Sequence, residues 1–275
     1  MSIRTWLLAA CAVGMLQAAP AQADTLAEIK SKGEMVVGME AAYVPYEFFK
    51  DGKIIGYDCD LAQKIADKIG VKTVFVDTEW NGIIPALYAR KFDVIISAMT
   101  MTRERSEKVR FSMPYGDAST VIFLRANDAS IKAADDLAGK PVGAQLGSAQ
   151  QQVGERFEAK LKAEGKPGFT ELKLYDHYPE AYLDLSNHRT DAVLNSLSTL
   201  LVVMKDQPGK FRIIGGVQDI KAYFGMAFRQ GDDAMVKVAD GVLGEMKANG
   251  ELTALQMKWF GTTMDSPNEL PAVLP

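Results

Sequence analysis

The chain has 275 residues, with 31 Lys plus Arg against 35 Asp plus Glu and a formal net charge of −4 at pH 7. This mildly acidic balance, without a basic cluster, argues against a nucleic-acid-binding protein. Two cysteines and two histidines are too few for a metal centre built on those ligands, and the chain has no P-loop, G-x-S-x-G or H-E-x-x-H motif. We therefore expect no metal, no cofactor and no enzyme of the usual motif-bearing classes.

The first 23 residues have the three parts of a secretory signal peptide. Arg4 supplies the positive charge, residues 6–16 an apolar stretch too short to span a bilayer, and residues 21–23 (Ala-Gln-Ala) a cleavage site. A lipoprotein box also ends at Cys11, but it would leave an apolar stretch shorter than the usual length of about 7–15 residues. We expect cleavage after Ala23 and export to the periplasm, without lipid anchoring at Cys11.

Short apolar strands and amphipathic helices alternate along the rest of the chain. The first series predicts strands at 35–39, 71–76 and 93–97 and helices at 57–70 and 83–90. After an extended run at 120–125, the second series predicts strands at 142–144, 172–175 and 191–195 and helices at 148–164, 179–187 and 198–205. A strand at 223–229 and helices at 232–250 and 252–260 end the pattern. Two such series with a late return predict two α/β lobes joined by a hinge, with a cleft between them.

Residues 92–105 carry the most informative polar pattern. A buried strand ends at a polar lip containing Ser97 and Thr100, and Thr102 is expected to be the N-cap of a helix that carries Arg105. Hydroxyls, free backbone N–H groups and a guanidinium would meet at one point, which suits a carboxylate. The alternative is an ordinary strand–loop–helix whose arginine pairs with a glutamate of the same helix.

Residues 56–66, Gly-Tyr-Asp-Cys-Asp-Leu-Ala-Gln-Lys-Ile-Ala, resemble the signature of the bacterial family 3 solute-binding proteins, the periplasmic receptors of polar amino acid ABC importers. Further similar stretches occur in the family's order at residues 43–48, before the signature, and at 84–87, 93–105, 139–143, 225–228 and 258–261, after it. Each stretch alone is weak evidence for the family, but in this order they are specific to it, and they span essentially the whole mature chain. Cys59 departs from the signature, which usually has an aliphatic residue there; a buried thiol behaves as a small hydrophobe.

The resemblance implies a type II periplasmic-binding-protein fold, which is an α/β architecture of two lobes, each a sheet flanked by helices, joined by a two-strand hinge. Lobe 1 is expected at residues 24–117 and again at 222–275, and lobe 2 at residues 118–221. The implied protein is a monomeric receptor that binds a small amino acid or amino acid derivative and presents it to an inner-membrane ABC permease. The resemblance does not imply an enzyme.

In the family, the segment after the third strand binds the α-carboxylate of the ligand. By motif, this role falls here on Ser97, the backbone N–H of Ala98, the hydroxyl and amide of Thr100, and Arg105. The motif and the chemistry agree, because these groups suit the oxygens of one carboxylate.

The resemblance also implies three side chains around the rest of the ligand. Tyr43 and Trp80 match the aromatic pair that sandwiches the ligand side chain, although core packing is the commoner fate of an aromatic residue. Glu40 matches an acidic position facing the distal group of the ligand, although a glutamate at a strand end is often only solvated.

From the second lobe, residues 145–150 resemble the loop that meets the ligand carboxylate from the opposite side. The helix that follows would present free N–H groups and its dipole to the anion. We assign this role to Ser148, the backbone of Ala149, and Gln150, while Ser148 could also be a plain N-cap. Tyr57 and Asp58 belong to the signature but are expected to be structural, at a helix start.

One departure from the family bears on the ligand. Ser196 stands where many members have a carboxylate that holds the ligand's α-ammonium. A serine hydroxyl cannot neutralise a cation, and losing such a partner would weaken binding by about 2–5 kcal/mol. Either Glu40 takes the ammonium, or the ligand is an N-substituted or opine-like amino acid or another carboxylate-bearing nitrogen compound that Asn195 could recognise.

A second function class stays open, because a few relatives of this family are periplasmic cyclohexadienyl dehydratases. Such chemistry needs a positioned acid and base in the cleft. Glu40 is one candidate, but the sequence places no second titratable group beside it.

Overall fold

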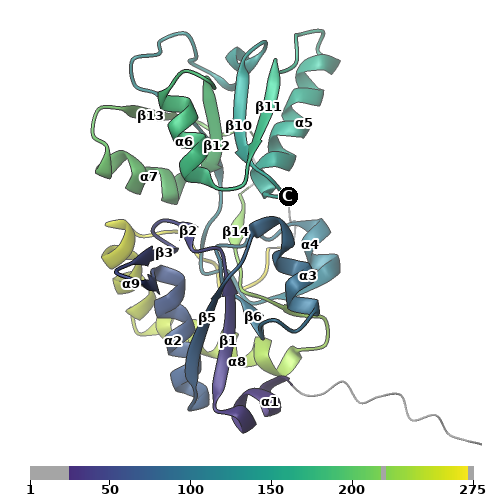
Figure 1. Ribbon diagram of the computed structural model, residues 1–275, viewed down its shortest axis with the longest axis vertical. Helices are drawn as coiled ribbons and strands as arrows, with labels where there is room; N and C mark the ends of the chain where they lie inside the picture. Colours follow the sequence, from purple (N-terminus) through teal and green to yellow (C-terminus); the bar gives the residue numbers. More distant parts are fainter. Residues whose placement is uncertain (1–24, 218–220, 272–275) are drawn as a thin grey trace, which may run out of the picture.

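The computed structural model describes residues 25–217 and 221–271, in which strands and helices alternate along the chain. They form two lobes, one above the other in Figure 1, each with a five-stranded sheet flanked by helices. The predicted two-lobed α/β fold is therefore confirmed. The predicted signal peptide and the alternative lipid site at Cys11 lie outside the described residues.

Lobe 1 is built on a sheet of order β5-β1-β6-β15-β7. Its strands are β1 (Glu34–Met39), β5 (Lys72–Asp77), β6 (Val94–Ile95), β7 (Val109–Phe111) and β15 (Ala227–Arg229). β1 is parallel to β5 and β6, and β15 is antiparallel to β6 and β7. The helices are α1 (Thr25–Lys32), α2 (Tyr57–Ile69), η1 (Trp80–Gly82), α3 (Ile83–Tyr88), α4 (Arg103–Lys108), α8 (Asp233–Ala248) and α9 (Glu251–Phe260).

Lobe 2, which comprises β9–β13, has a sheet of order β11-β10-β12-β9-β13. Its strands are β9 (Thr120–Arg125), β10 (Pro141–Gln145), β11 (Glu171–Tyr175), β12 (Ala192–Ser196) and β13 (Phe211–Ile214). Its helices are η2 (Ala134–Leu137), α5 (Ala149–Ala163), α6 (Tyr178–Ser186) and α7 (Leu197–Asp206). β10 is parallel to β11 and β12, so their carboxyl ends meet at one edge of the sheet, where the loops face lobe 1 (Figure 1).

A two-stranded antiparallel sheet joins the lobes. It pairs β8 (Gly116–Asp117) with β14 (Tyr223–Phe224). The predicted strand at 223–229 is thus two strands, β14 in the hinge and β15 in the lobe 1 sheet. The break falls at Gly225, where a Cβ would lie 3.1 Å from the Phe111 ring, and its N–H donates to Met99 O at 3.0 Å.

Local sequence signals explain where the helices near the cleft begin and end. Thr102 caps α4 by accepting the N–H of Arg105, as predicted. Ser148 caps α5 by accepting the N–H of Gln151. α2 ends at Gly70, whose left-handed φ of 82° suits a residue without a Cβ.

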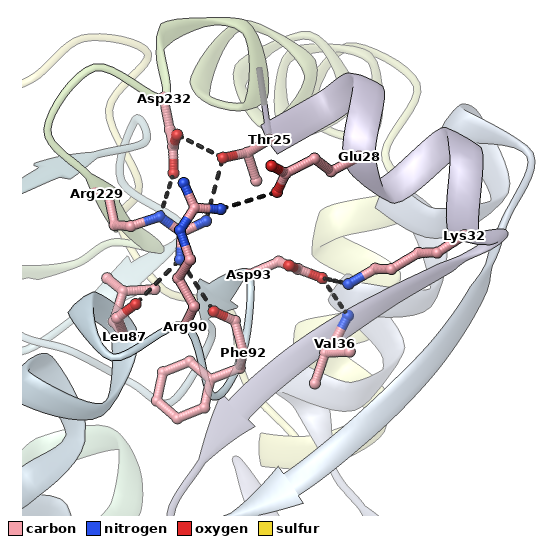
Figure 2. Close-up of polar contacts among 10 residues, drawn as sticks. All are labelled: Thr25, Glu28, Lys32, Val36, Leu87, Arg90, Phe92, Asp93, Arg229 and Asp232. Carbon is pink, nitrogen blue, oxygen red and sulfur yellow. Dashed lines mark hydrogen bonds and ion pairs between the residues drawn. The ribbon is translucent and has the colours of Figure 1, made fainter. Parts of the chain in front are cut away.

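Several elements were not predicted, among them helix α1, strands β7, β8 and β13, and a small sheet of β2 (Ala42–Tyr43), β3 (Glu47–Lys50) and β4 (Lys53–Ile55). Figure 2 shows how polar contacts tie α1 to lobe 1. Thr25 donates to Asp232 at 2.6 Å and accepts from Arg229 at 3.1 Å, and Lys32 pairs with Asp93 at 2.6 Å. α1 is therefore held by side chains distant in sequence, which a short local pattern does not reveal.

Candidate functional site in the cleft between the lobes

A small cavity lies between the two lobes and is lined by both. Its walls are Glu40, Tyr43, Glu47, Trp80, Ser97, Ala98, Thr100, Arg105 and Phe224 from lobe 1 and Gln145, Ser148, Ala149, Gln150 and Tyr178 from lobe 2. All the predicted site residues except Asn195 and Ser196 are in this set. The cavity volume of about 20 Å³ has room for about one water molecule, so the lobes are closed over it.

Arg105 lies in the wall of the cavity and is buried, with 7% of its surface exposed. Its Nη1 donates to Thr100 O at 2.9 Å and its Nη2 crosses the cleft to Gly147 O at 3.0 Å. The guanidinium also lies 5.1 Å from the centre of the Trp80 ring. Burial lowers the pKa of Arg105 to about 10, so the group keeps its positive charge at neutral pH.

The alternative in which Arg105 pairs with a glutamate of its own helix is not what the structure shows. Glu104 pairs instead with Lys108 at 2.6 Å and accepts from Gln152 of lobe 2 at 2.8 Å. Among the described residues, no acidic side chain forms an ion pair with Arg105. A buried guanidinium bonded only to carbonyl oxygens can take a carboxylate in their place.

Two of the donors predicted for the ligand carboxylate are already engaged. The N–H of Ala98 donates to Asp58 Oδ2 at 2.6 Å, and the hydroxyl of Ser97 donates to Glu47 Oε1 at 2.7 Å while accepting the N–H of Glu40 at 3.0 Å. The donor roles expected for these two groups are therefore not open to a ligand in this structure. Sequence showed the groups at the strand end but not the buried acids that compete for them.

The wall from lobe 2 is the loop before α5 and the start of that helix. Ser148 donates to Gln145 O at 2.7 Å and caps the helix, so the N-cap alternative holds. The backbone N–H groups of Ala149 and Gln150 belong to the first turn, which has no partners within the helix. Trp80 of lobe 1 reaches this loop, where its Nε1 donates to Gly147 O at 3.1 Å.

Glu40 is buried at the lobe interface rather than solvated, with 3% exposed. Its carboxylate accepts two bonds from Gln145 Nε2, at 2.7 and 2.8 Å, and lies 2.6 Å from His177 Nδ1. Burial raises the pKa of Glu40, and the hydrogen bond from His177 opposes that shift. The same hydrogen bond raises the pKa of His177. Glu40 thus bridges the lobes.

Asn195 and Ser196 lie at the end of β12 and reach the cavity through Tyr43. The Tyr43 hydroxyl donates to Asn195 Oδ1 at 2.7 Å and lies 3.0 Å from Ser196 Oγ. Asn195 in turn donates to the Tyr182 hydroxyl at 2.6 Å. These side chains form a neutral polar network without a carboxylate.

A second, larger cavity of about 650 Å³ adjoins the first. The two share the side chains of Trp80 and Arg105, which form the partition between them. Apolar and aromatic side chains of η1 and α3, among them Ile84 and Tyr88, line much of it, and Gln152 of α5 contributes from lobe 2.

Four cavity residues were not predicted as site residues: Glu47, Gln145, Tyr178 and Phe224. Gln145 directly follows a predicted strand, and Tyr178 directly precedes a predicted helix. Side chains that follow the carboxyl ends of parallel strands commonly face a ligand. The sequence could therefore have indicated both residues as site residues. Glu47 and Phe224 carry no such local signal.

Within the described residues, no group of three or more His, Cys, Asp or Glu side chains could hold a metal ion. Across residues 25–217 and 221–271, no helix is both long and apolar enough to cross a membrane.

The fold and the cleft define a two-lobed solute-binding protein. The family model of the bacterial extracellular solute-binding proteins, family 3, matches residues 35–262, and the chain belongs to this family. The L-cystine-binding protein TcyJ of Escherichia coli (strain K12) is 32% identical over 254 residues, covering 92% of each chain. The arginine-binding extracellular protein ArtP of Bacillus subtilis (strain 168) is 30% identical over 264 residues, covering 94% of this chain and 98% of the relative.

Solved structures are similar in the same way. The ancestral amino acid-binding protein AncCDT-1, a precursor of cyclohexadienyl dehydratase, has a TM-score of 0.77 at 33% identity and covers 86% of this chain and 99% of its own. An ancestral arginine-binding protein bound to arginine has a TM-score of 0.73 at 36% identity, covering 83% and 99%.

Proposed function

We propose that this protein is the periplasmic, monomeric receptor of an ABC importer and captures an amino acid derivative between its lobes by binding its carboxylate at Arg105. The observation that carries the proposal is the buried, charged guanidinium in the cleft wall, bonded only to carbonyl oxygens of both lobes. Family membership and the amino acid-binding relatives support it. The partner would be an inner-membrane permease, and residues 1–23 would be removed on export.

We place the lobe boundaries at residues 117/118 and 221/222. The hinge strands β8 and β14 lie next to these positions. Closure of the lobes would form the contacts that exist only between them, such as the hydrogen bond from Arg105 to Gly147. A ligand bound by both lobes favours the closed state because its contacts are complete only there.

The ligand that fits best lacks an ordinary α-ammonium group. Ser196 offers no negative charge, and Glu40 is already engaged by Gln145 and His177. An N-substituted or opine-like amino acid needs less compensation, and the adjoining cavity behind Trp80 and Arg105 has space for a bulkier substituent.

Mass spectrometry of the small molecule that co-purifies with the protein tests the proposal, followed by calorimetric titration with the standard amino acids and with N-substituted ones. A carboxylate-bearing amino acid derivative is expected. Tight binding of plain glutamine, histidine or arginine would reject the proposed ligand class but not the proposed receptor function. Binding of ligands without a carboxylate would reject the role of Arg105.

A second candidate function is an enzyme similar to cyclohexadienyl dehydratase. The observation that favours it is the pair of Glu40 and His177, whose atoms Oε1 and Nδ1 lie 2.6 Å apart and could serve as acid and base. Incubation of the purified protein with prephenate or arogenate separates the two functions. Turnover by the wild type that is lost in Glu40→Gln would establish the enzymatic function. If neither compound is converted, the receptor function is the one that remains.

A further inference from the structure

Two buried carboxyl groups meet directly beneath the cleft. Glu47 of β3 and Asp58 of α2 each have 0% of their surface exposed. Glu47 Oε1 accepts from Ser97, at 2.7 Å, and Asp58 Oδ2 accepts from the N–H of Ala98, at 2.6 Å, and from the Tyr115 hydroxyl, at 3.0 Å. The other two oxygens, Glu47 Oε2 and Asp58 Oδ1, receive no donor from any described residue, and the two acids accept from neighbouring residues of one segment, Ser97 and Ala98.

Two neighbouring carboxylates in a fully buried site cannot both be charged without a nearby cation. The titratable groups with the largest influence on the pair, or most affected by it, lie in lobe 1 and include no cation: Glu40, Tyr43, Tyr46, Tyr57, Cys59 and Tyr115. Arg105 lines the same cavity as Glu47, but its guanidinium donates to Thr100 O and Gly147 O and not to the pair. Burial raises the pKa of Glu47, and the charge of Asp58 raises it further. Burial also raises the pKa of Asp58.

We propose that Glu47 and Asp58 hold one shared proton at neutral pH, between Glu47 Oε2 and Asp58 Oδ1, so that Glu47 Oε1 remains the acceptor of the Ser97 hydroxyl and the Ser97 oxygen is left as an acceptor toward the cleft. One proton satisfies both oxygens that otherwise lack a donor. With the proton there, Glu47 Oε1 can only accept a hydrogen bond, and the Ser97 hydroxyl donates its single proton to that oxygen.

The Glu47–Asp58 pair therefore positions residues 97–98, which face the cleft. Ser97 Oγ accepts the N–H of Glu40 and keeps one acceptor site, which can receive an N–H group of the ligand but cannot donate to its carboxylate. Ala98 has a φ of 40°, unusual for a residue with a Cβ, and its bond to Asp58 holds that conformation. The effect on the ligand rests on the proposed function, whereas the shared proton does not.

The sign of the pH dependence follows from the proton count. Above the ordinary Glu pKa of 4.5, the unfolded chain has released the proton that the folded pair retains. Stability is then lost as pH rises, until the folded pair also deprotonates. One proton corresponds to about a tenfold fall in the folding equilibrium constant per pH unit.

Glu47→Gln tests the proton, because the amide N–H can replace it toward Asp58 and the amide oxygen can still accept from Ser97. Urea unfolding between about pH 6 and about pH 8 is expected to show a wild-type dependence steeper by one proton than that of the variant. The matched control is Glu245→Gln, an exposed side chain, which should keep the wild-type slope. An equal slope in Glu47→Gln and wild type would overturn the proposal.

Infrared spectroscopy gives a readout that a purely structural role would not move. At about pH 8, the wild type should show the carbonyl band of a protonated carboxylic acid, and Glu47→Gln should lose it. Absence of this band from the folded wild type would also overturn the proposal. Both measurements use the ligand-free protein, so a failure of the proposed receptor function would leave their outcome unchanged.

Discussion

Replacing Arg105 with alanine removes the group on which the proposed ligand site depends. The side chain is 7% exposed and donates to Thr100 O within lobe 1 and to Gly147 O across the cleft. Its loss takes away the carboxylate anchor and one direct bond between the lobes. It also removes half of the partition that separates the two cavities.

The expected effect on affinity is large and the effect on stability modest. Truncating one partner of a desolvated charged pair costs about 2–5 kcal/mol, which weakens binding about 30-fold to about 4000-fold. Hydrogen bonds from a charged group are worth about 1.5–3 kcal/mol each, but only the bond to Thr100 lies within one lobe, because the bond to Gly147 contributes to closure more than to the folding of either lobe. Arg105→Lys keeps the charge but loses the two-pronged geometry, so an intermediate loss is expected.

Calorimetric titration with the ligand recovered from the purified protein measures these losses, and urea unfolding measures stability in parallel. The matched control is Arg103→Ala, which removes an exposed arginine from the first residue of the same helix and should leave the affinity within about twofold. If Arg105→Ala bound the ligand as tightly as Arg103→Ala, the carboxylate would not sit at this guanidinium.

Trp80→Ala should weaken binding by about 1–3 kcal/mol if the indole covers the ligand, and unchanged affinity in calorimetry would return Trp80 to a packing role. Gly147→Ala should hinder closure, because a Cβ there would lie 2.9 Å from Asn81 Oδ1 at a left-handed φ of 73°; small-angle scattering that shows an equally compact ligand-bound form would contradict this. His177→Gln should reduce the pH dependence of affinity. The hydrogen bond to Glu40 raises the pKa of His177 above its usual 6.5. The charged pair therefore favours closure at low pH, and this contribution is lost as pH rises from about 6.5 through the raised pKa. Titrations on either side of neutrality would contradict this if variant and wild type changed in parallel.

Much of the fold follows from local signals in the sequence. Thr102 was predicted as an N-cap from its place before a charged helical turn, and its side chain does accept the N–H of Arg105. The helix starting at Tyr57 and its end at Gly70 follow from the apolar face and the glycine. The strand at 223–229 was predicted as continuous, whereas the structure divides it at Gly225, where the chain passes from the hinge to lobe 1.

The site was predicted less completely, because partner choice is set by residues far apart in the chain. Sequence placed Ser97 and Ala98 at the strand end, but their donors are used by Glu47 and Asp58. Nothing local to either acid indicates that the two meet. The contact of Glu40 with His177 has the same origin, since 137 positions separate the two residues.

A crystal structure of the protein with its co-purified ligand is the most direct test of carboxylate capture between the lobes. We expect a ligand carboxylate within hydrogen-bonding distance of both Nη atoms of Arg105, with contacts from the start of α5 on the opposite side. A ligand bound elsewhere, or one in the cleft with its carboxylate turned away from Arg105 while the bonds to Thr100 and Gly147 persist, would contradict it.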